Sequence, residues 1–217
     1  MSQPQRKQRA SEAYRFSVAY PASWWSVDLH PAVRDAEIRK RLLDGMSDRD
    51  QARHAGDIRE AVRAARKWAT ACYEQGALQF FGFFDVVDDI PLTALTMVLR
   101  YVVPEDEELD LSELMVGFAM HNAGVPLGKG TAANRTEILD LPNAGPAGRF
   151  TAIHEVETEG LETTRFSVMN TIVPLAGTRE TLIVTSLTPN VDFADPFLAL
   201  FEQIHDTLAL EKVTADA

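Results

Sequence analysis

Alternating apolar and polar positions mark the first ordered segment of the chain. Tyr14, Phe16, Val18 and Tyr20 recur at every second residue, the spacing that places side chains on one face of a β-strand. Pro21 follows and ends the run, because proline cannot donate to a strand ladder. We therefore predict a strand over 14–20, preceded by a flexible tail over residues 1–12.

Helical spacing follows this strand. Pro31 suits the first turn of a helix and Gly45 suits its end, so a short helix is predicted between them. A longer helix is predicted over 57–75, capped by Asp57 and ended by Gly76. The polar stretch between the two helices is predicted to be a loop. The buried side of the longer helix follows a four-and-three spacing and comprises Ile58, Val62, Ala65, Ala69 and Cys72.

Two runs rich in Phe, Val, Leu, Thr and Tyr, residues 78–87 and 92–103, predict a β-hairpin joined at 88–91. Gly82 inside the first run indicates a bulge or the close approach of another part of the chain. The phenylalanines around it, Phe80, Phe81, Phe83 and Phe84, predict a strand that helices bury on both faces.

The second half continues with a predicted helix over 111–121 and strands over 137–141, 148–157, 163–173 and 181–187, separated by turn residues. A closing helix is predicted over 193–210, with an apolar side formed by Phe193, Phe197, Leu200, Phe201, Ile204 and Leu208. This order predicts one α+β domain over 13–210, followed by a flexible tail over 211–217. Its mainly antiparallel β-sheet is predicted to be covered by helices.

The net charge narrows the classes of partner. The chain has 217 residues and a formal net charge of −11, so nucleic acid and anionic membranes are unfavourable partners. The charge is uneven, because residues 34–67 hold ten Lys and Arg. Acidic residues interleave them, which favours a solvated, salt-bridged helical face over a nucleic-acid stripe and leaves a docking face as the alternative.

The apolar runs of the chain and its cysteine content predict the cellular compartment and the absence of a disulfide. No apolar segment follows the basic N-terminus and no apolar run is long enough to span a membrane, so we expect a cytoplasmic protein without membrane insertion. Cys72 is the single cysteine, which excludes an intramolecular disulfide. Its place on the packed side of a helix favours a core residue over a nucleophile.

The sequence contains no complete motif for catalysis or for cofactor binding. Residues 124–131 depart from a phosphate loop in glycine spacing and in the residue after Lys129. The five histidines show no metal-ligand spacing, and His205 beside Asp206 is interpreted as solvated surface. His154 and Glu155 are neighbours in a strand and face apart. No GxSxG elbow is present, so we expect no cofactor and no enzyme, with a site dispersed along the chain left as an alternative.

Trp24 and Trp25 are the most informative aromatic pair. Neighbours at the end of a strand face apart, so Trp24 is expected in the core. Trp25 either packs under the helix that begins near Pro31 or meets a partner. Buried Trp often anchors interfaces. The candidate interface residues are therefore Trp25 together with Arg59, Arg63 and Arg66 of the basic stretch.

The two ends of the chain carry a family resemblance. Phe16-x-x-x-Tyr20-Pro21-x-x-Trp24 at the start, and the strand 182–187 followed by Thr188-Pro189-Asn190 and a Phe-rich helix, resemble Mog1/PsbP-like domains. Together with residues 141–146, the layout resembles uncharacterised actinobacterial proteins of that shape. The resemblance implies an α/β/α sandwich and an accessory or binding role, while the insert at 34–76 departs from it.

Three hypotheses about function remain open. The first is a non-catalytic adaptor or accessory protein with an unknown protein partner, for example in secretion or complex assembly. The second is a small-molecule or lipid-binding domain with its pocket beside the Phe-rich strand. The third is an enzyme with a dispersed site. Homo-oligomerisation through an exposed edge strand also stays open.

Overall fold

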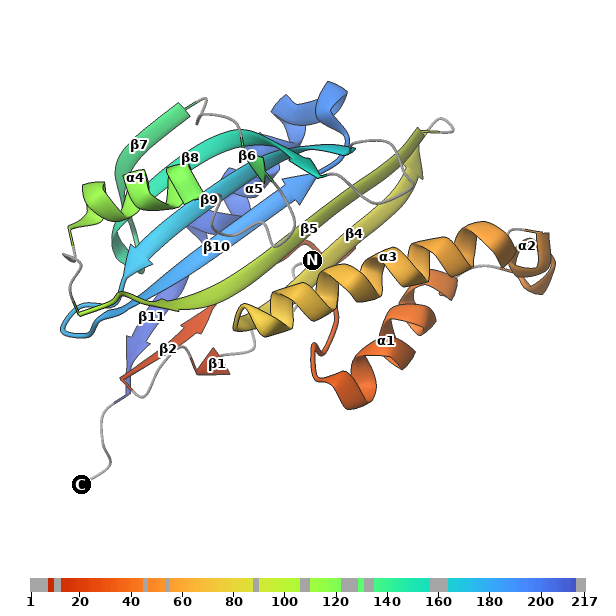
Figure 1. Cartoon of the computed structure of the whole chain (residues 1–217), viewed down its shortest axis with the longest axis horizontal. Helices are drawn as coiled ribbons and strands as arrows, with labels where there is room; N and C mark the ends of the chain where they lie inside the picture. Colours follow the sequence, from red (N-terminus) through yellow and green to blue (C-terminus); the bar gives the residue numbers. More distant parts are fainter. Residues whose placement is uncertain are drawn as a thin grey trace.

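A computed structural model gives the fold (Figure 1) and describes residues 8–9, 13–44, 47–53, 55–87, 90–105, 110–121, 129–130, 135–156 and 164–213. The helices are α1 (Pro31–Leu43), α2 (Asp48–Arg53), α3 (Ala55–Glu74), α4 (Leu111–His121) and α5 (Ala194–Asp206), with a 3-10 turn at Val191–Phe193. The strands are β1 (Gln8–Arg9), β2 (Tyr14–Ser17), β3 (Trp25–Ser26), β4 (Ala77–Val87), β5 (Ile90–Val102), β6 (Lys129–Gly130), β7 (Arg135–Leu141), β8 (Gly145–Val156), β9 (Thr164–Pro174), β10 (Glu180–Thr188) and β11 (Ala209–Lys212).

An antiparallel sheet organises these elements. Its strand order is β3-β4-β5-β10-β9-β8-β6, and β7 also pairs with β8. Strands β4 and β5 form a hairpin, and strands β7 to β10, which follow one another along the chain, form a meander. The pairing of β10 with β5 joins the hairpin and the meander into one sheet. A second, small sheet with the order β1-β2-β11 brings the two ends of the chain together.

Helices cover both faces of the large sheet (Figure 1). One hydrophobic cluster joins the sheet to α1, α3 and α4 through Ile38, Cys72 and Met115. The other joins the opposite face to α5 and β2, where Phe16 and Phe201 are almost fully buried. The predicted α+β class, an antiparallel sheet flanked by helices, is therefore confirmed.

Local periodicity explains the elements that the sequence predicts well. The alternating residues of β2 and its extension, Tyr14, Phe16, Val18 and Tyr20, are all buried. Helix α1 begins at Pro31, and the His30 side chain accepts a hydrogen bond from the backbone N–H of Ala32. Helix α3 turns Val62, Ala69 and Cys72 inward, as a stripe of that spacing requires. The predicted hairpin and the helix over 111–121 are also confirmed.

The closing helix is shorter than predicted. It ends at Asp206, and Leu210 lies in β11 instead. The Thr207 hydroxyl donates to the carbonyl of Ile204 at 2.6 Å and accepts from the N–H of Ala19 at 2.8 Å, which ties the end of the helix to the N-terminal segment. Phe193, expected on the apolar side, is exposed.

Other local predictions differ as well. A short helix, α2, forms within the predicted polar loop. Phe84 is 53% exposed, so the Phe-rich strand is not buried on both faces along its whole length. The predicted tails contribute Gln8–Arg9 to β1 and the end of β11 to the small sheet. Most of the segment 124–131, which departs from a phosphate loop, lies outside the described residues, and Lys129–Gly130 form β6.

Candidate functional site

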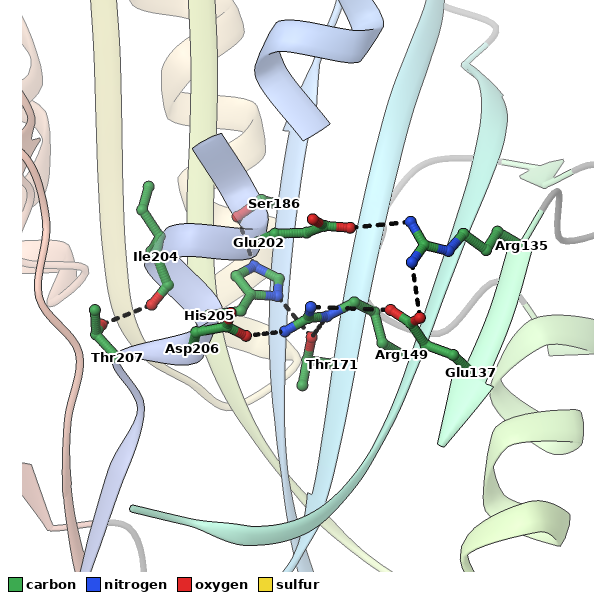
Figure 2. A network of polar contacts seen from close by, with 10 residues as sticks. All are labelled: Arg135, Glu137, Arg149, Thr171, Ser186, Glu202, Ile204, His205, Asp206 and Thr207. Carbon is green, nitrogen blue, oxygen red and sulfur yellow. Dashed lines mark hydrogen bonds and ion pairs between the residues drawn. The ribbon is translucent and has the colours of Figure 1, made fainter. Parts of the chain in front are cut away.

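A chain of buried polar side chains connects α5 to the sheet (Figure 2). The His205 ring hydrogen-bonds through Nε2 to the Ser186 hydroxyl at 2.8 Å and through Nδ1 to the Thr171 hydroxyl at 2.7 Å. Ser186 in turn lies 2.6 Å from the Thr96 hydroxyl on β5. His205 is fully buried, so its interpretation as solvated surface is wrong. The sequence shows only that His205 lies on the polar side of a helix, whereas in the structure hydroxyl groups of two strands form hydrogen bonds with its ring.

His205 is neutral in this environment. Burial is the main cause that lowers its pKa to about 3, and the nearby positive charge of Arg149 lowers it further. A neutral imidazole has one donor and one acceptor nitrogen, and a hydroxyl can serve either. Ser186 is fully buried too, so this Ser–His pair links helix to sheet and presents no surface to a reacting molecule.

Arg149 on β8 carries the polar chain outward to solvent. Its Nε donates to Thr171 at 3.2 Å and its terminal nitrogen donates to Asp206 at 2.6 Å. The guanidinium also lies 3.9 Å from the Glu137 carboxylate. Although Arg149 is 5% exposed, its charge is balanced by carboxylates on two elements, which is the condition for burying a cation.

A second arginine completes the network shown in Figure 2. Arg135 on β7 donates to Glu137 at 2.8 Å and to Glu202 on α5 at 3.1 Å. Glu137 therefore bridges Arg135 and Arg149. Both of its ion pairs and the two that reach α5 fix β7, β8 and the helix relative to one another.

These groups line a cleft of about 400 Å³. Its charged lining consists of Arg135, Glu137, Asp140, Arg149, Glu202 and Asp206, and its apolar wall consists of Leu139, Leu141 and Pro142. The volume falls in the range of small-molecule sites. With four carboxylates against two guanidiniums, the cleft carries negative charge.

Trp25 is half-buried and packs into the helix-covered core. Its indole lies over Gly82: a Cβ at that position would approach the ring to 2.6 Å. The close approach predicted from Gly82 thus involves Trp25, and the role of Trp25 as a candidate interface residue stays a prediction. Trp24, at 1% exposed, is in the core as predicted.

The predicted interface arginines lie on α3. Arg59, Arg63 and Arg66 are exposed, and the structure does not bring them to the cleft lining. Arg66 forms an ion pair with Asp35 of α1 at 3.4 Å, and Asp35 also pairs with Arg34 at 3.3 Å. Part of this basic stretch therefore joins the two helices.

The remaining chemical candidates occupy structural positions. Cys72 is buried, its Sγ lies 3.6 Å from the Met97 sulfur, and burial raises its pKa to about 12. His154 is buried and Glu155 is exposed, so these neighbours face apart as predicted; burial lowers the pKa of His154. Among the described residues, no group of three or more His, Cys, Asp or Glu could hold a metal ion. None of the described helices is long and apolar enough to span a membrane.

Sequence reasoning missed the cleft and the polar chain behind it. The residues come from β7 and β8, which are consecutive, and from α5, which lies far from them along the chain. One signal was available: Thr171 and Ser186 are among the hydroxyl residues set between apolar residues in two predicted strands, and buried hydroxyls need hydrogen-bonding partners. That signal indicates a polar contact without identifying His205 as the partner.

Comparisons with known proteins find similar folds among solved structures. No family model and no curated protein matches the chain. The chain is similar to the solution structure of cyanobacterial PsbP (CyanoP) from Synechocystis sp. PCC 6803, with 14% identity, a TM-score of 0.47 and coverage of 97% of this chain and 92% of that chain. It is also similar to the crystal structure of LpqN, involved in cell envelope biogenesis of Mycobacterium tuberculosis, with 8% identity, a TM-score of 0.46 and coverage of 96% and 91%.

The first of these structures is a PsbP, the kind of domain that the two ends of the sequence resemble. At this identity and TM-score the similarity concerns the overall fold alone, and neither protein's role is transferred to this chain.

Proposed function

We propose that this chain is a non-catalytic binding protein whose docking face is the solvent-facing side of α1, α2 and α3, and whose partner is a protein with an acidic surface. The observation that carries the proposal is the distribution of charge. Residues 31–76 hold ten Lys and Arg against eight Asp and Glu, on a chain whose net charge is −11. The helical insert is therefore net positive, and the rest of the chain is more negative than the whole.

The packing of the insert supports this use. Ile38 of α1 and Cys72 of α3 point into the core, which turns basic side chains outward. Lys40 on α1 and Arg59 and Lys67 on α3 are exposed. A surface of this sign attracts an acidic partner over a distance of about 10 Å at moderate salt and raises the association rate more than it raises affinity.

Arg66 links two helices of this face. Arg66 fixes α3 to α1 through Asp35, so it shapes the face as well as charging it. Arg63 is exposed on the same helix. Trp25 packs against the hydrophobic cluster that contains Ile38 and Cys72, and its indole lies against Gly82.

The test is a double charge reversal, Arg59→Glu with Lys67→Glu, in tagged full-length protein used to retain partners from the native extract. Both residues are exposed, and neither makes an ion pair with another described residue. We expect a stoichiometric acidic partner to be retained by the wild type and its retention to fall at least about tenfold with the reversal.

The matched control reverses two basic residues outside the insert, Arg165→Glu with Lys212→Glu, which are exposed on β9 and β11. This control changes the net charge equally and should keep the partner. Equal loss from both double variants would show a general charge effect and contradict the proposed face. Retention by the first variant at wild-type level, with unchanged circular dichroism, would contradict it as well.

A further inference from the structure

The cleft between β7 and α5 lies on the α5-covered face of the sheet, whereas the proposed docking helices pack on the other face. We propose that this cleft binds a small organic cation, an alkyl chain that bears a guanidinium or ammonium group. The inference is independent of the helical docking face, because it rests on different residues.

Several carboxylate oxygens of the cleft accept no hydrogen bond from the two arginines. Asp206 uses Oδ1 on Arg149 and Glu202 uses Oε1 on Arg135. Within the described part of the chain, the second oxygen of each carboxylate accepts no hydrogen bond, and the Asp140 carboxylate makes no hydrogen bond or ion pair. Guanidinium and ammonium groups carry only donors, so they match these oxygens.

Buried contacts hold the carboxylates of the cleft in place. Arg149 has a side chain that is 6% exposed and is bound by Thr171 and Asp206. This buried anchor positions Asp206 at the rim, and Arg135 positions Glu202 beside it. A ligand therefore meets carboxylates that are already oriented, which reduces the entropy lost on binding.

The cleft disfavours a ligand of the opposite charge. An anion would have to displace Glu137, Glu202 or Asp206 from the two guanidiniums and would meet the field of four carboxylates. A cation meets that field with the favourable sign. The apolar wall of Leu139, Leu141 and Pro142 provides a surface for methylene groups next to the charged end.

The experiment titrates full-length protein with agmatine, which carries a guanidinium and an ammonium on a butane chain, and follows amide shifts by NMR. Saturable shifts confined to β7 and the C-terminal half of α5 are expected, and binding should weaken as ionic strength rises. Asp140→Asn should weaken affinity about fivefold, the scale of one exposed ion pair. Asp140 is exposed and its side chain makes no hydrogen bond or ion pair with the described residues, so this variant should fold normally.

Two controls make the result decisive. Glu155→Gln removes an exposed carboxylate on β8 whose residue does not line the cleft, and it should leave agmatine affinity unchanged. Butyrate, with a similar chain and the opposite charge, should not bind. Absence of saturable agmatine binding, equal weakening by both variants, or preferential binding of butyrate would each overturn the proposal. Binding of an arginine-containing peptide without binding of agmatine would also overturn it and identify a protein-docking site instead.

Discussion

The neutral, buried His205 makes a prediction about stability and pH. Its folded-state pKa is about 3 against an ordinary value of 6.5. Between these two values the unfolded chain binds a proton that the folded chain does not, so this residue's contribution to stability rises with pH. That contribution is fully present above pH 6.5 and is lost as the pH falls toward 3.

The magnitude follows from the size of the shift. The difference between 6.5 and about 3 corresponds to about 5 kcal/mol in total, and to about 2 kcal/mol already lost at pH 5. The groups that surround the ring do not oppose this loss. Ser186 and Thr171 are neutral hydroxyls, and Arg149 disfavours the protonated ring. Asp206 is the adjoining carboxylate, and its Oδ1 is engaged by Arg149.

The perturbation is His205→Gln, which retains polar atoms for the strand hydroxyls and removes the titrating ring. At pH 7 the variant should be less stable by about 1–3 kcal/mol, because Ser186 or Thr171 loses a buried hydrogen bond. Since only the wild type loses the linked contribution on acidification, the deficit should shrink by about 2 kcal/mol by pH 5.

The assay is urea unfolding followed by tryptophan fluorescence at several pH values between 7 and 5, with both proteins fitted to the same denaturant slope. Other titrating groups affect both proteins and cancel in the difference, including the buried His154. Parallel stability curves for the two proteins over this range would refute the reasoning. A His205 ring resonance that titrates near its ordinary pKa would refute it as well.

Three further predictions rest on packing. Gly82→Ala should destabilise the fold by about 1–3 kcal/mol and change tryptophan fluorescence, because the new Cβ meets the Trp25 ring at 2.6 Å; Gly56→Ala, with no atom within 4 Å, is the control and should not destabilise. Cys72 should react with a thiol reagent only after unfolding, because its pKa is raised to about 12 by burial; rapid reaction of the native protein would contradict this. Phe201→Ala should cost about 3–5 kcal/mol in urea unfolding, since this ring is fully buried beneath α5; a loss below 1 kcal/mol would show that the core collapses around the site.

Much of the fold could be predicted because the deciding signals are local. The alternation at Tyr14–Tyr20 and the stripe through Val62, Ala69 and Cys72 identify a strand and a helix from neighbouring residues alone. Turn residues separate the strands of the meander, and its four predicted runs match β7–β10 within a few residues. Periodicity reports which side of an element faces the core, whatever that core turns out to be.

The candidate site could not be predicted in this way. Arg135 and Glu202 are 67 positions apart and Arg149 and Asp206 are 57 apart, and no local pattern pairs them. The apolar spacing continues to Leu208 and predicts a closing helix that runs to Leu210. The chain instead turns at Thr207 to add β11 to the small sheet, which local spacing does not reveal.

The sequence by itself determined the class of the fold, most element positions and the inward side of each element, because these depend on residue spacing and on turn chemistry over short distances. Tertiary structure alone decided that β10 lies beside β5, that α5 covers strands bearing Thr171 and Ser186, and that His205 is therefore buried and neutral. Burial and pKa depend on which distant groups surround a side chain. The polar side of a helix therefore does not show whether His205 will be buried or neutral, because the sheet that surrounds its ring forms only in the folded protein.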